Sequence, residues 1–476
     1  MIDETIKATN PLSRESKAAP DEREQQGRAA RAKVPRTSQS SVDAGSQRDV
    51  VALLEEDAPS RIPDLLPIRY GRMLVSPFTF YRGSAIVMAK DLARTPHTGL
   101  TVQLCGDAHL ANFGGFASPE RTFVFDLNDF DETLPGPFEW DVKRLATSIE
   151  VAGRDRNFTA AERRNAVLAS VDQYSNAMRA FATQGDLDVW YARLDSEGLR
   201  AELKAAGDRK QDKVLKKTET KARTKDSMKA FSRLTEVVDG ERRIVSDPPL
   251  LTPVRELVDR DQDEIEEEIT GLLGAYQDTL PGDRRHLVEG YRYLDLARKV
   301  VGIGSVGTRC WIVLLVGRDD DDPLFLQVKE AGESVLEPAL ERSRFANRGQ
   351  RIVEGQRLMQ ASSDIFLGWI HNERGLDGVA RDFYVRQLWD WKASADLEAV
   401  IPRGLELYGR ACAWTLARAH ARSGDRIAIA AYLGKGDVFS RAVAEFADAY
   451  ADLNQRDYGA LADARREGRI VAKDGL

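Results

Sequence analysis

The sequence predicts an α+β protein that combines a mostly helical part with a small antiparallel sheet. Three observations predict this class. Apolar residues recur at helical spacing from the segment PFEWDVKRLATSIEVAGR to about residue 203, and helical patterns resume over about 253–297. Between 298 and 395, short apolar runs such as TRCWIVLLV and PLFLQVKEA are joined by the turn-like GRDDDDP and read as strands. Helical spacing then returns over 396–476.

These patterns divide the chain into four segments. Residues 1–48 are rich in Ser, Arg, Glu, Gln and Ala and contain no aromatic residue, which predicts a disordered tail. Residues 49–297 form the first helical lobe, with a basic insertion near 204–233 that is either a solvated helical stretch or a docking surface for an acidic partner. Residues 298–395 form a β-rich lobe, and we expect the helices of 396–476 to return to the first lobe.

Composition bounds the location of the protein and its partners. No run approaches the ~20 apolar residues that span a bilayer, and the N-terminus lacks the basic and apolar parts of a secretory signal. Three cysteines far apart in the chain indicate a reducing compartment rather than a disulfide framework or zinc site. A net charge of −7 argues against nonspecific nucleic-acid binding. We therefore expect a cytoplasmic protein with no membrane partner, and the sequence does not indicate the oligomeric state.

The loop CGDAHLAN, which follows the strand-like TVQLC, carries the first set of candidate functional residues. Phosphoryl transfer needs a carboxylate beside the attacking hydroxyl and oxygen ligands for Mg²⁺. Asp107 and Asn112, five residues apart on this loop, can supply one of each. His109 either organises the loop by hydrogen bonding or transfers a proton. The next strand-like run, TFVFDL, leads into Asp126 and Asp129, which are alternatives for a second metal ligand.

The second set of candidate residues comes about 200 residues later, in GIGSVG and FLQVK. The G-x-G-x-x-G spacing occurs in dinucleotide-binding folds, but these need a helix after the glycines, whereas a strand follows here. A glycine loop between two strands is the arrangement that covers phosphates in kinases. Lys329 lies on the next strand, where it can bind α- and β-phosphates, and Glu354 on the following helix can orient it.

The first loop resembles a known catalytic loop. GDAHLAN is similar to the G-D-x-H-x-x-N loop of aminoglycoside and choline kinases, and LNDFDE to the I-D-W-E-D segment that follows it. In that superfamily an Asp-Leu-Ala landmark comes twelve residues after the metal-binding aspartate. Asp141 lies twelve residues after Asp129, with Leu145 and Ala146 just beyond, so this register favours Asp129 over Asp126.

The resemblance implies a bilobal protein-kinase-like fold that is circularly permuted, because the glycine loop and lysine follow the catalytic loop instead of preceding it. Its C-lobe is mostly helical and its N-lobe is a small antiparallel sheet. With the segment YGRMLVSPFTFYRGSA, nearly everything after residue 50 resembles the bacterial family called domain of unknown function 2252. One departure is Cys105, where kinases carry histidine, which leaves reduced or altered catalysis open.

The function implied is ATP-dependent transfer of the γ-phosphoryl group to a hydroxyl of a small-molecule or protein acceptor that the sequence does not identify. The implied cofactors are ATP and Mg²⁺. The residues implied are Asp107 and His109 for catalysis, Asn112 and Asp129 for the metal, and Gly302, Gly304, Ser305, Gly307, Lys329 and Glu354 for the nucleotide.

Alternatives remain for the function and for several residues. The same fold also occurs as nucleotide-binding regulatory modules without turnover and as AMP transferases. Arg82 either meets a phosphate or forms a structural pair with a carboxylate. Trp389 and Trp391 either stack on a base or pack in the core.

Overall fold

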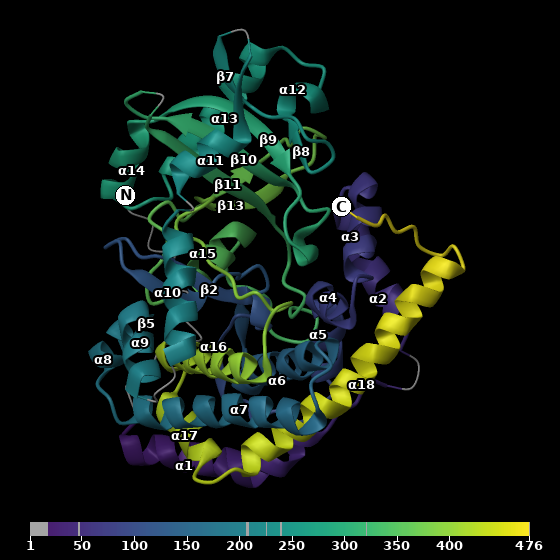
Figure 1. Cartoon of the computed structure of the whole chain (residues 1–476), viewed down its shortest axis with the longest axis vertical. Coiled ribbons are helices and arrows are strands. Elements are labelled where there is room, and N and C mark those ends of the chain that lie inside the picture. The colour runs from purple at the N-terminus through teal and green to yellow at the C-terminus, as the bar shows by residue number, and fades with distance from the viewer. Residues whose placement is uncertain are drawn as a thin grey trace, which may run out of the picture.

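The protein is a mixed α+β structure with 53% helix and 16% strand, which confirms the predicted class. The computed structural model describes residues 18–45, 48–205, 209–224, 226–238, 240–319 and 321–475. Figure 1 shows the largest sheet toward one end of the molecule and long helices toward the other. Across the described residues, no helix is both long and apolar enough to cross a membrane.

The largest sheet has six strands in the order β12-β13-β11-β10-β9-β8, and every neighbouring pair is antiparallel. Its strands are β8 (Leu251–Pro253), β9 (Arg292–Lys299), β10 (Cys310–Val316), β11 (Pro323–Ala331), β12 (Gly368–Asn372) and β13 (Arg381–Gln387). Helix α15 (Arg348–Met359) packs against β11, β12 and β13. The antiparallel strands predicted within 298–395 are therefore present, in the predicted chain order.

The sheet part begins earlier than residue 298, so the predicted boundary is wrong. Strand β9 has Leu296 in the core on one face of the sheet and Ala297 in the core on the other, a period of two within a stretch that we read as helical. Helix α11 (Ser227–Leu234) also belongs to this part, because Phe231 packs against β10 and β11 on the face of the sheet that carries Ala297. The end of the basic insertion is thus core structure rather than a solvated stretch.

Four helices form the centre of the helical part. They are α6 (Phe138–Asp155), α7 (Ala160–Ala182), α16 (Pro402–Ser423) and α18 (Val438–Arg466). Helix α6 is buried along nearly its whole length because α7, α16 and α18 all contact it. Helix α16 begins with a proline in its first turn, where a missing N–H costs nothing. The helices α16 and α18, from the C-terminal end of the chain, thus pack against α6 and α7.

The remaining helices and strands lie around and between these two parts. The helices are α1 (Pro20–Lys33), α2 (Val50–Asp57), α3 (Leu66–Met73), α4 (Pro77–Gly83), α5 (Ala85–Leu92), α8 (Asp186–Tyr191), α9 (Ser196–Ala205), α10 (Arg209–Arg223), α12 (Val254–Leu257), α13 (Gln262–Gln277), α14 (Gly282–Glu289) and α17 (Arg426–Leu433). The strands are β1 (Thr101–Leu104), β2 (Phe113–Ala117), β3 (Phe123–Leu127), β4 (Leu134–Pro137), β5 (Leu194–Asp195), β6 (Thr235–Val238) and β7 (Glu241–Ile244).

The predicted disordered tail over 1–48 is wrong for its second half, where α1 packs against α17. Arg31 donates to the main-chain oxygen of Tyr432 (2.8 Å), and Arg36 donates to that of Leu433 (2.6 Å). A Cβ at Gly27 would collide with the carbonyl of Ala428, so glycine permits the close approach. Hydrogen bonds to the carbonyls at the end of α17 hold a segment that has few apolar side chains. Residues 1–17 lie outside the described residues.

Candidate functional site

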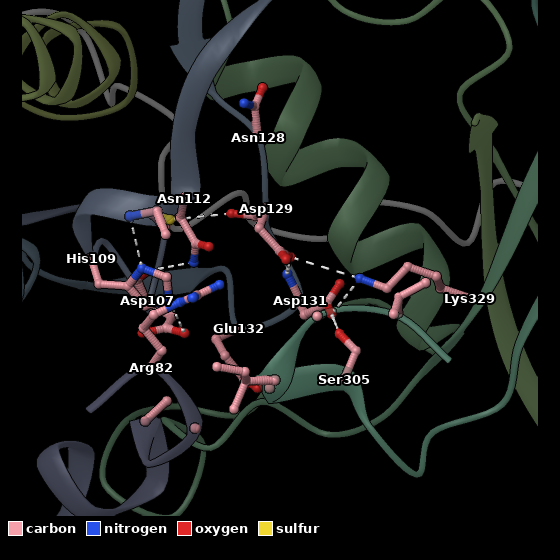
Figure 2. Close-up of a pocket in the computed structure, with 18 of the residues that line it drawn as sticks. Arg82, Asp107, His109, Asn112, Asn128, Asp129, Asp131, Glu132, Ser305 and Lys329 are labelled. Atoms are coloured by element: carbon pink, nitrogen blue, oxygen red, sulfur yellow. Dashed lines mark hydrogen bonds and ion pairs between the residues drawn. The ribbon is translucent and has the colours of Figure 1, made fainter. Parts of the chain in front are cut away.

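A cavity of about 330 Å³ lies where the helical part meets the large sheet. Four stretches far apart in the sequence line it, as Figure 2 shows. They are the N-terminal helices, the loop after β1, the segment after β3, and the sheet with its glycine loop. The predicted residues that line it are Asp107, His109, Asn112, Asp129, Gly302, Gly304, Ser305 and Lys329.

The loop after β1 is fixed by Asp141 at the start of α6. Its carboxylate accepts from the N–H groups of Cys105 (2.7 Å) and Gly106 (3.0 Å), and the His420 Nε2 lies 3.2 Å from it. Gly106 has φ +85°, and a Cβ there would collide with the carbonyl of Glu132. A carboxylate in the first turn of α6 therefore holds the turn that presents Asp107.

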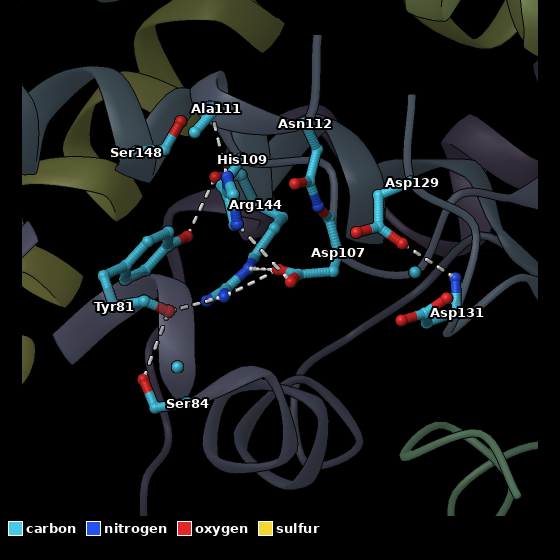
Figure 3. A network of polar contacts seen from close by, with 12 residues as sticks. Tyr81, Ser84, Asp107, His109, Ala111, Asn112, Asp129, Asp131, Arg144 and Ser148 are labelled. Atoms are coloured by element: carbon cyan, nitrogen blue, oxygen red, sulfur yellow. Dashed lines mark hydrogen bonds and ion pairs between the residues drawn. The ribbon is translucent and has the colours of Figure 1, made fainter. Parts of the chain in front are cut away.

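Asp107 is held by Arg144 of α6. The Arg144 Nε and Nη2 atoms each lie 2.8 Å from the Asp107 Oδ1, and the guanidinium stacks over the ring of Tyr81 at 3.8 Å. Burial would lower the pKa of Arg144, but Tyr81 and Asp107 raise it overall, so Arg144 is charged. Figure 3 shows this network. It fixes Oδ1 and leaves Oδ2 as the less engaged oxygen of Asp107.

His109 is buried and neutral. Burial lowers its pKa to about 3, and its Nδ1 accepts the N–H of Ala111 at 3.2 Å. The proton of the neutral ring therefore sits on Nε2, which lies 3.5 Å from the Asp107 Oδ2. Only 3% of His109 is exposed, so its contacts are those of a residue that positions the loop.

Asn112 and Asp129 lie on the same side of the cavity. The Asn112 Nδ2 donates to the main-chain oxygen of Asp107 at 2.7 Å, which leaves the amide Oδ1 as an acceptor. Burial, with the neighbouring charge of Asp131, raises the pKa of Asp129. Two carboxylates held side by side in a partly closed cavity favour a cation between or beside them.

Lys329 meets both carboxylates. Its ammonium lies 2.7 Å from the Asp131 Oδ2 and 3.9 Å from the Asp129 Oδ1. The hydroxyl of Tyr384 donates to the Asp131 Oδ1 at 2.7 Å, and Ser305 of the glycine loop donates to Oδ2 at 3.3 Å. Burial would raise the pKa of Asp131, but Lys329 and Tyr384 lower it to about 2.

Glu354 does not orient Lys329, contrary to the expectation from the sequence. Its carboxylate accepts from Arg357 on its own helix at 3.1 Å, and it is not among the residues that line the cavity. Helix α15 instead points Arg351 toward the site, where it donates to the main-chain oxygen of Asp131 at 2.8 Å. Asp131 takes the place that we expected Glu354 to fill.

The glycine loop connects the antiparallel strands β9 and β10, as expected. Gly302, Gly304 and Ser305 line the cavity, whereas Gly307 does not. Gly307 has φ +93° and lies against the side chain of Arg61, so its role is to turn the chain. Arg61 also donates to the carbonyl of Gly304 at 2.9 Å and fixes the loop to the N-terminal helices.

Arg82 of α4 lines the cavity next to Asp107 (Figure 2). Its buried Nε has no hydrogen-bond partner, and no described carboxylate is paired with it. Burial lowers the pKa of Arg82, although Asp107 opposes this. Of the two tryptophans that could stack on a base, Trp389 lines the cavity, whereas Trp391 lies between Arg121 (4.4 Å) and Arg223 (4.3 Å).

Asp131 and Arg144, the partners of Lys329 and Asp107, were not among the residues expected from the sequence. Asp131 is two residues after Asp129 in LNDFDE, so it was visible as a second acidic residue at the same position. Arg144 is three residues after Asp141 on α6, which places both near one face of that helix. Which carboxylate pairs with Lys329 depends on tertiary packing and has no local signal.

Asp126, the alternative metal ligand, is a buried anchor. Its side chain pairs with Arg418 of α16, and its Oδ2 accepts the N–H of Ala361 at 2.8 Å. Both side chains of the ion pair are at most 2% exposed. Asp126 lies outside the cavity lining.

Asp126→Ala should lower the free energy of unfolding by about 3–5 kcal/mol, because it leaves the buried charge of Arg418 without its partner. Chemical denaturation at pH 7 measures this. Asp452→Ala, which removes one exposed carboxylate beside Arg154, is the matched control and should cost less than about 1 kcal/mol. Equal losses of unfolding free energy in the two variants would contradict a stabilising role of the buried pair between Asp126 and Arg418.

The buried carboxyl of Glu132 should make the stability of the fold depend on pH. Burial raises its pKa to about 7, although the N–H of Val335 opposes this. A carboxyl whose pKa is higher in the folded state than in the unfolded chain destabilises the fold progressively as pH rises from about 4.5 through 7. Glu132→Gln should therefore reduce the fall in the free energy of unfolding between pH 5 and pH 8. Chemical denaturation at both pH values measures this. An equal fall in the free energy of unfolding for the two proteins would contradict the prediction.

Within the described residues, no three His, Cys, Asp or Glu side chains form a metal-binding group. A cation at this cavity would therefore use the amide of Asn112 with the carboxylate of Asp129, and oxygen atoms of the bound substrate. Mg²⁺ characteristically binds in this way, through one or two carboxylates plus phosphate oxygens. The donor set fits Mg²⁺ and does not fit a zinc site built from cysteine and histidine.

Comparison with known proteins identifies the chain only at the level of a family. No curated protein and no solved structure matches it. A family model does match, over residues 61–464, which is most of the chain. The match includes every residue that lines the cavity except Asp57 at the end of α2. The chain belongs to the family described as uncharacterized protein conserved in bacteria, domain of unknown function 2252.

Proposed function

We propose that the protein is an ATP-dependent phosphotransferase of the kinase-like superfamily, with a bilobal and circularly permuted fold. The observation that carries this is the meeting of Lys329 with Asp129 and Asp131 beside Asp107 and Asn112. These residues come from segments about 200 positions apart. A lysine on a strand, an amide, a metal carboxylate and a separate carboxylate for the acceptor are the parts that phosphoryl transfer requires.

The order of elements supports the permutation. A glycine loop between two strands, a lysine strand, a helix and two further strands run from β9 to β13, and α16 then returns to the helical part. The loop with Asp107 precedes all of them. The segment after β13, where Trp389 lines the cavity, is the proposed contact for the adenine base.

When bound, Mg²⁺–ATP would supply the γ-phosphoryl group and neutralise the charge on its oxygens. Lys329 would hold phosphate oxygens, and Asn112 and Asp129 would hold the metal. Asp131 keeps Lys329 in place through its 2.7 Å contact. Arg82, whose buried Nε lacks a partner, would donate to an oxygen of the group being transferred.

Asp107 would orient the acceptor hydroxyl and accept its proton. Arg144 fixes Oδ1, so Oδ2 would be the atom that contacts the acceptor hydroxyl. His109, neutral and buried, positions this carboxylate and does not transfer a proton. Cys105 supports the loop: burial raises the pKa of its thiol well above the usual value, and Sγ lies 3.3 Å from the main-chain oxygen of Asp129.

The experiment is a screen for label transfer from γ-labelled ATP to bacterial metabolites and proteins, with Mg²⁺ present. We expect a labelled product that depends on the protein and on the metal. Transfer of label from α-labelled ATP alone would mean AMP transfer. The proposal would be contradicted if neither label were transferred and calorimetry detected no binding of Mg²⁺–ATP.

One observation favours a second function, a nucleotide-binding regulatory module without turnover. Asp107 is ion-paired with Arg144 through two nitrogen atoms, and this pairing competes with its use as a base. Such a module would bind Mg²⁺–ATP and show no transfer with either label. Arg144→Lys, which loosens the bidentate contact, would leave binding unchanged in that case and produce no turnover.

A further inference from the structure

A second cavity, of about 420 Å³, lies on the other face of the large sheet. Val328 lines it, and Val328 is next to Lys329 on β11, so the two side chains point to opposite faces. Helix α13 covers this face. The two cavities share no lining residue: Arg61 lines the candidate site, whereas Ile62 and Pro63 line the second cavity. The inference below is independent of the proposed function.

The walls of this cavity are apolar. One wall is the sheet, which contributes Leu296, Trp311, Val313, Val328, Ile370 and Phe383. The other wall is α13, which contributes Ile269, Leu272 and Leu273. Trp311 and the three α13 side chains remain only partly buried, although they pack against the core of the sheet part. The chain thus leaves apolar surface facing a space between two of its own layers. Such surface favours an apolar occupant.

The charged side chains at this cavity are paired, with one exception. Glu268 pairs with Arg260 (2.9 Å), and Asp377 pairs with Arg309 (2.9 Å) and Arg381 (2.5 Å). Arg298, which follows Leu296 on the same face of β9, makes no hydrogen bond or ion pair with a described residue, and its Nε is buried. Among the charged groups of this lining, the guanidinium of Arg298 is thus the one without an ion-pair partner in the described residues, and it is the expected contact for an anionic group.

We propose that this cavity binds an anionic amphiphile, with a single alkyl chain between α13 and the sheet and a carboxylate or phosphate head group on Arg298. The volume lies in the range of small-molecule sites, about 300–1,000 Å³, which are also mainly apolar with few polar groups. A guanidinium matches the geometry of carboxylate and phosphate oxygens. A helix of another protein, about 10 Å across, does not fit between two packed layers.

The test is calorimetric titration of the full chain with decanoate, decyl phosphate and the neutral decanol, each below its micelle concentration. We expect saturable binding at one site. Arg298→Gln should weaken the binding of the two anions by about tenfold or more and that of decanol by less than about twofold, because it removes only the charge-assisted contact. The stronger of the two anions identifies the head group.

Two further variants separate this site from the surface. Leu272→Trp should fill the cavity and weaken all three ligands by about tenfold or more. Arg292→Gln, on the exposed part of the same strand, is the matched control and should leave all three affinities unchanged. Thermal unfolding checks that each variant is folded.

Several outcomes would overturn the proposal. They are the absence of saturable binding of either anion, equal weakening of the anions by Arg298→Gln and Arg292→Gln, and binding that survives Leu272→Trp. Dissociation of a dimer on addition of decanoate would also overturn it, because the cavity would then belong to an interface with a second copy of this chain.

Discussion

Asp107→Asn should reduce phosphoryl transfer by roughly 10²–10⁴-fold, the usual contribution of general-base catalysis. The amide keeps the shape of the side chain and can still accept from Arg144, so the loop should hold its position. It cannot take a proton from the acceptor hydroxyl. We therefore expect the affinity for Mg²⁺–ATP to stay within about threefold of wild type, since the loss lies in the chemical step. Label transfer and calorimetry measure the two quantities.

The matched control is Glu132→Gln, which makes the same chemical change at another carboxylate of the cavity. Glu132 accepts the N–H of Val335 at 2.7 Å, and glutamine retains an acceptor there. We expect its transfer rate to stay within about threefold of wild type. Wild-type turnover in Asp107→Asn, or an equal loss in both variants, would remove Asp107 from the proposed role.

Lys329→Met should abolish detectable binding of Mg²⁺–ATP and destabilise the fold. The side chain is 3% exposed, and its removal leaves Asp129 and Asp131 facing each other without their cation. Breaking a buried ion pair costs about 3–5 kcal/mol, and we expect about 3 because both carboxylates are partly exposed. Calorimetry and denaturant unfolding at pH 7 test the two effects.

The difference in stability between wild type and Lys329→Met should depend on pH. Burial would raise the pKa of Asp131, but Lys329, with Tyr384, lowers it to about 2 in the fold, below its value of about 3.9 in an unfolded chain. The stabilisation is therefore complete above about pH 4 and is lost as pH falls toward 2. The gap between the two proteins should be widest at neutral pH and narrow on acidification.

Lys299→Met is the control for this prediction. Lys299 lines the same cavity from β9, but forms no ion pair with a described residue, and burial lowers its pKa. Its replacement should not reduce stability by more than about 1 kcal/mol. An equal loss in both lysine variants would contradict the importance of the pair with Asp131.

Local patterns predicted much of the fold. Strand β11 lies where the apolar run PLFLQVKEA predicts it, and α6 where PFEWDVKRLATSIEVAGR does. Asp141, which the sequence places in the same helix, accepts the N–H groups of the turn before Asp107. These features depend on periodicity and on short-range hydrogen bonds, which a single sequence contains.

Long-range contacts account for what the sequence did not predict. Helix α1 has few apolar residues, and it is held by arginines that reach carbonyls of α17 about 400 positions away. The partner of Lys329 is Asp131, 198 residues earlier in the chain, rather than Glu354, 25 residues later. Neither pairing follows from a short spacing in the sequence. The charged residues can be read from the sequence, but which residues they contact depends on tertiary packing.

A crystal structure of the protein with Mg²⁺ and a non-hydrolysable ATP analogue tests the central proposal most directly. We expect the phosphates between Lys329 and the glycine loop, the metal on Asn112 and Asp129, and the base toward Trp389. A nucleotide bound elsewhere, or in this cavity with its phosphates away from Lys329 and Asp129, would contradict a permuted kinase.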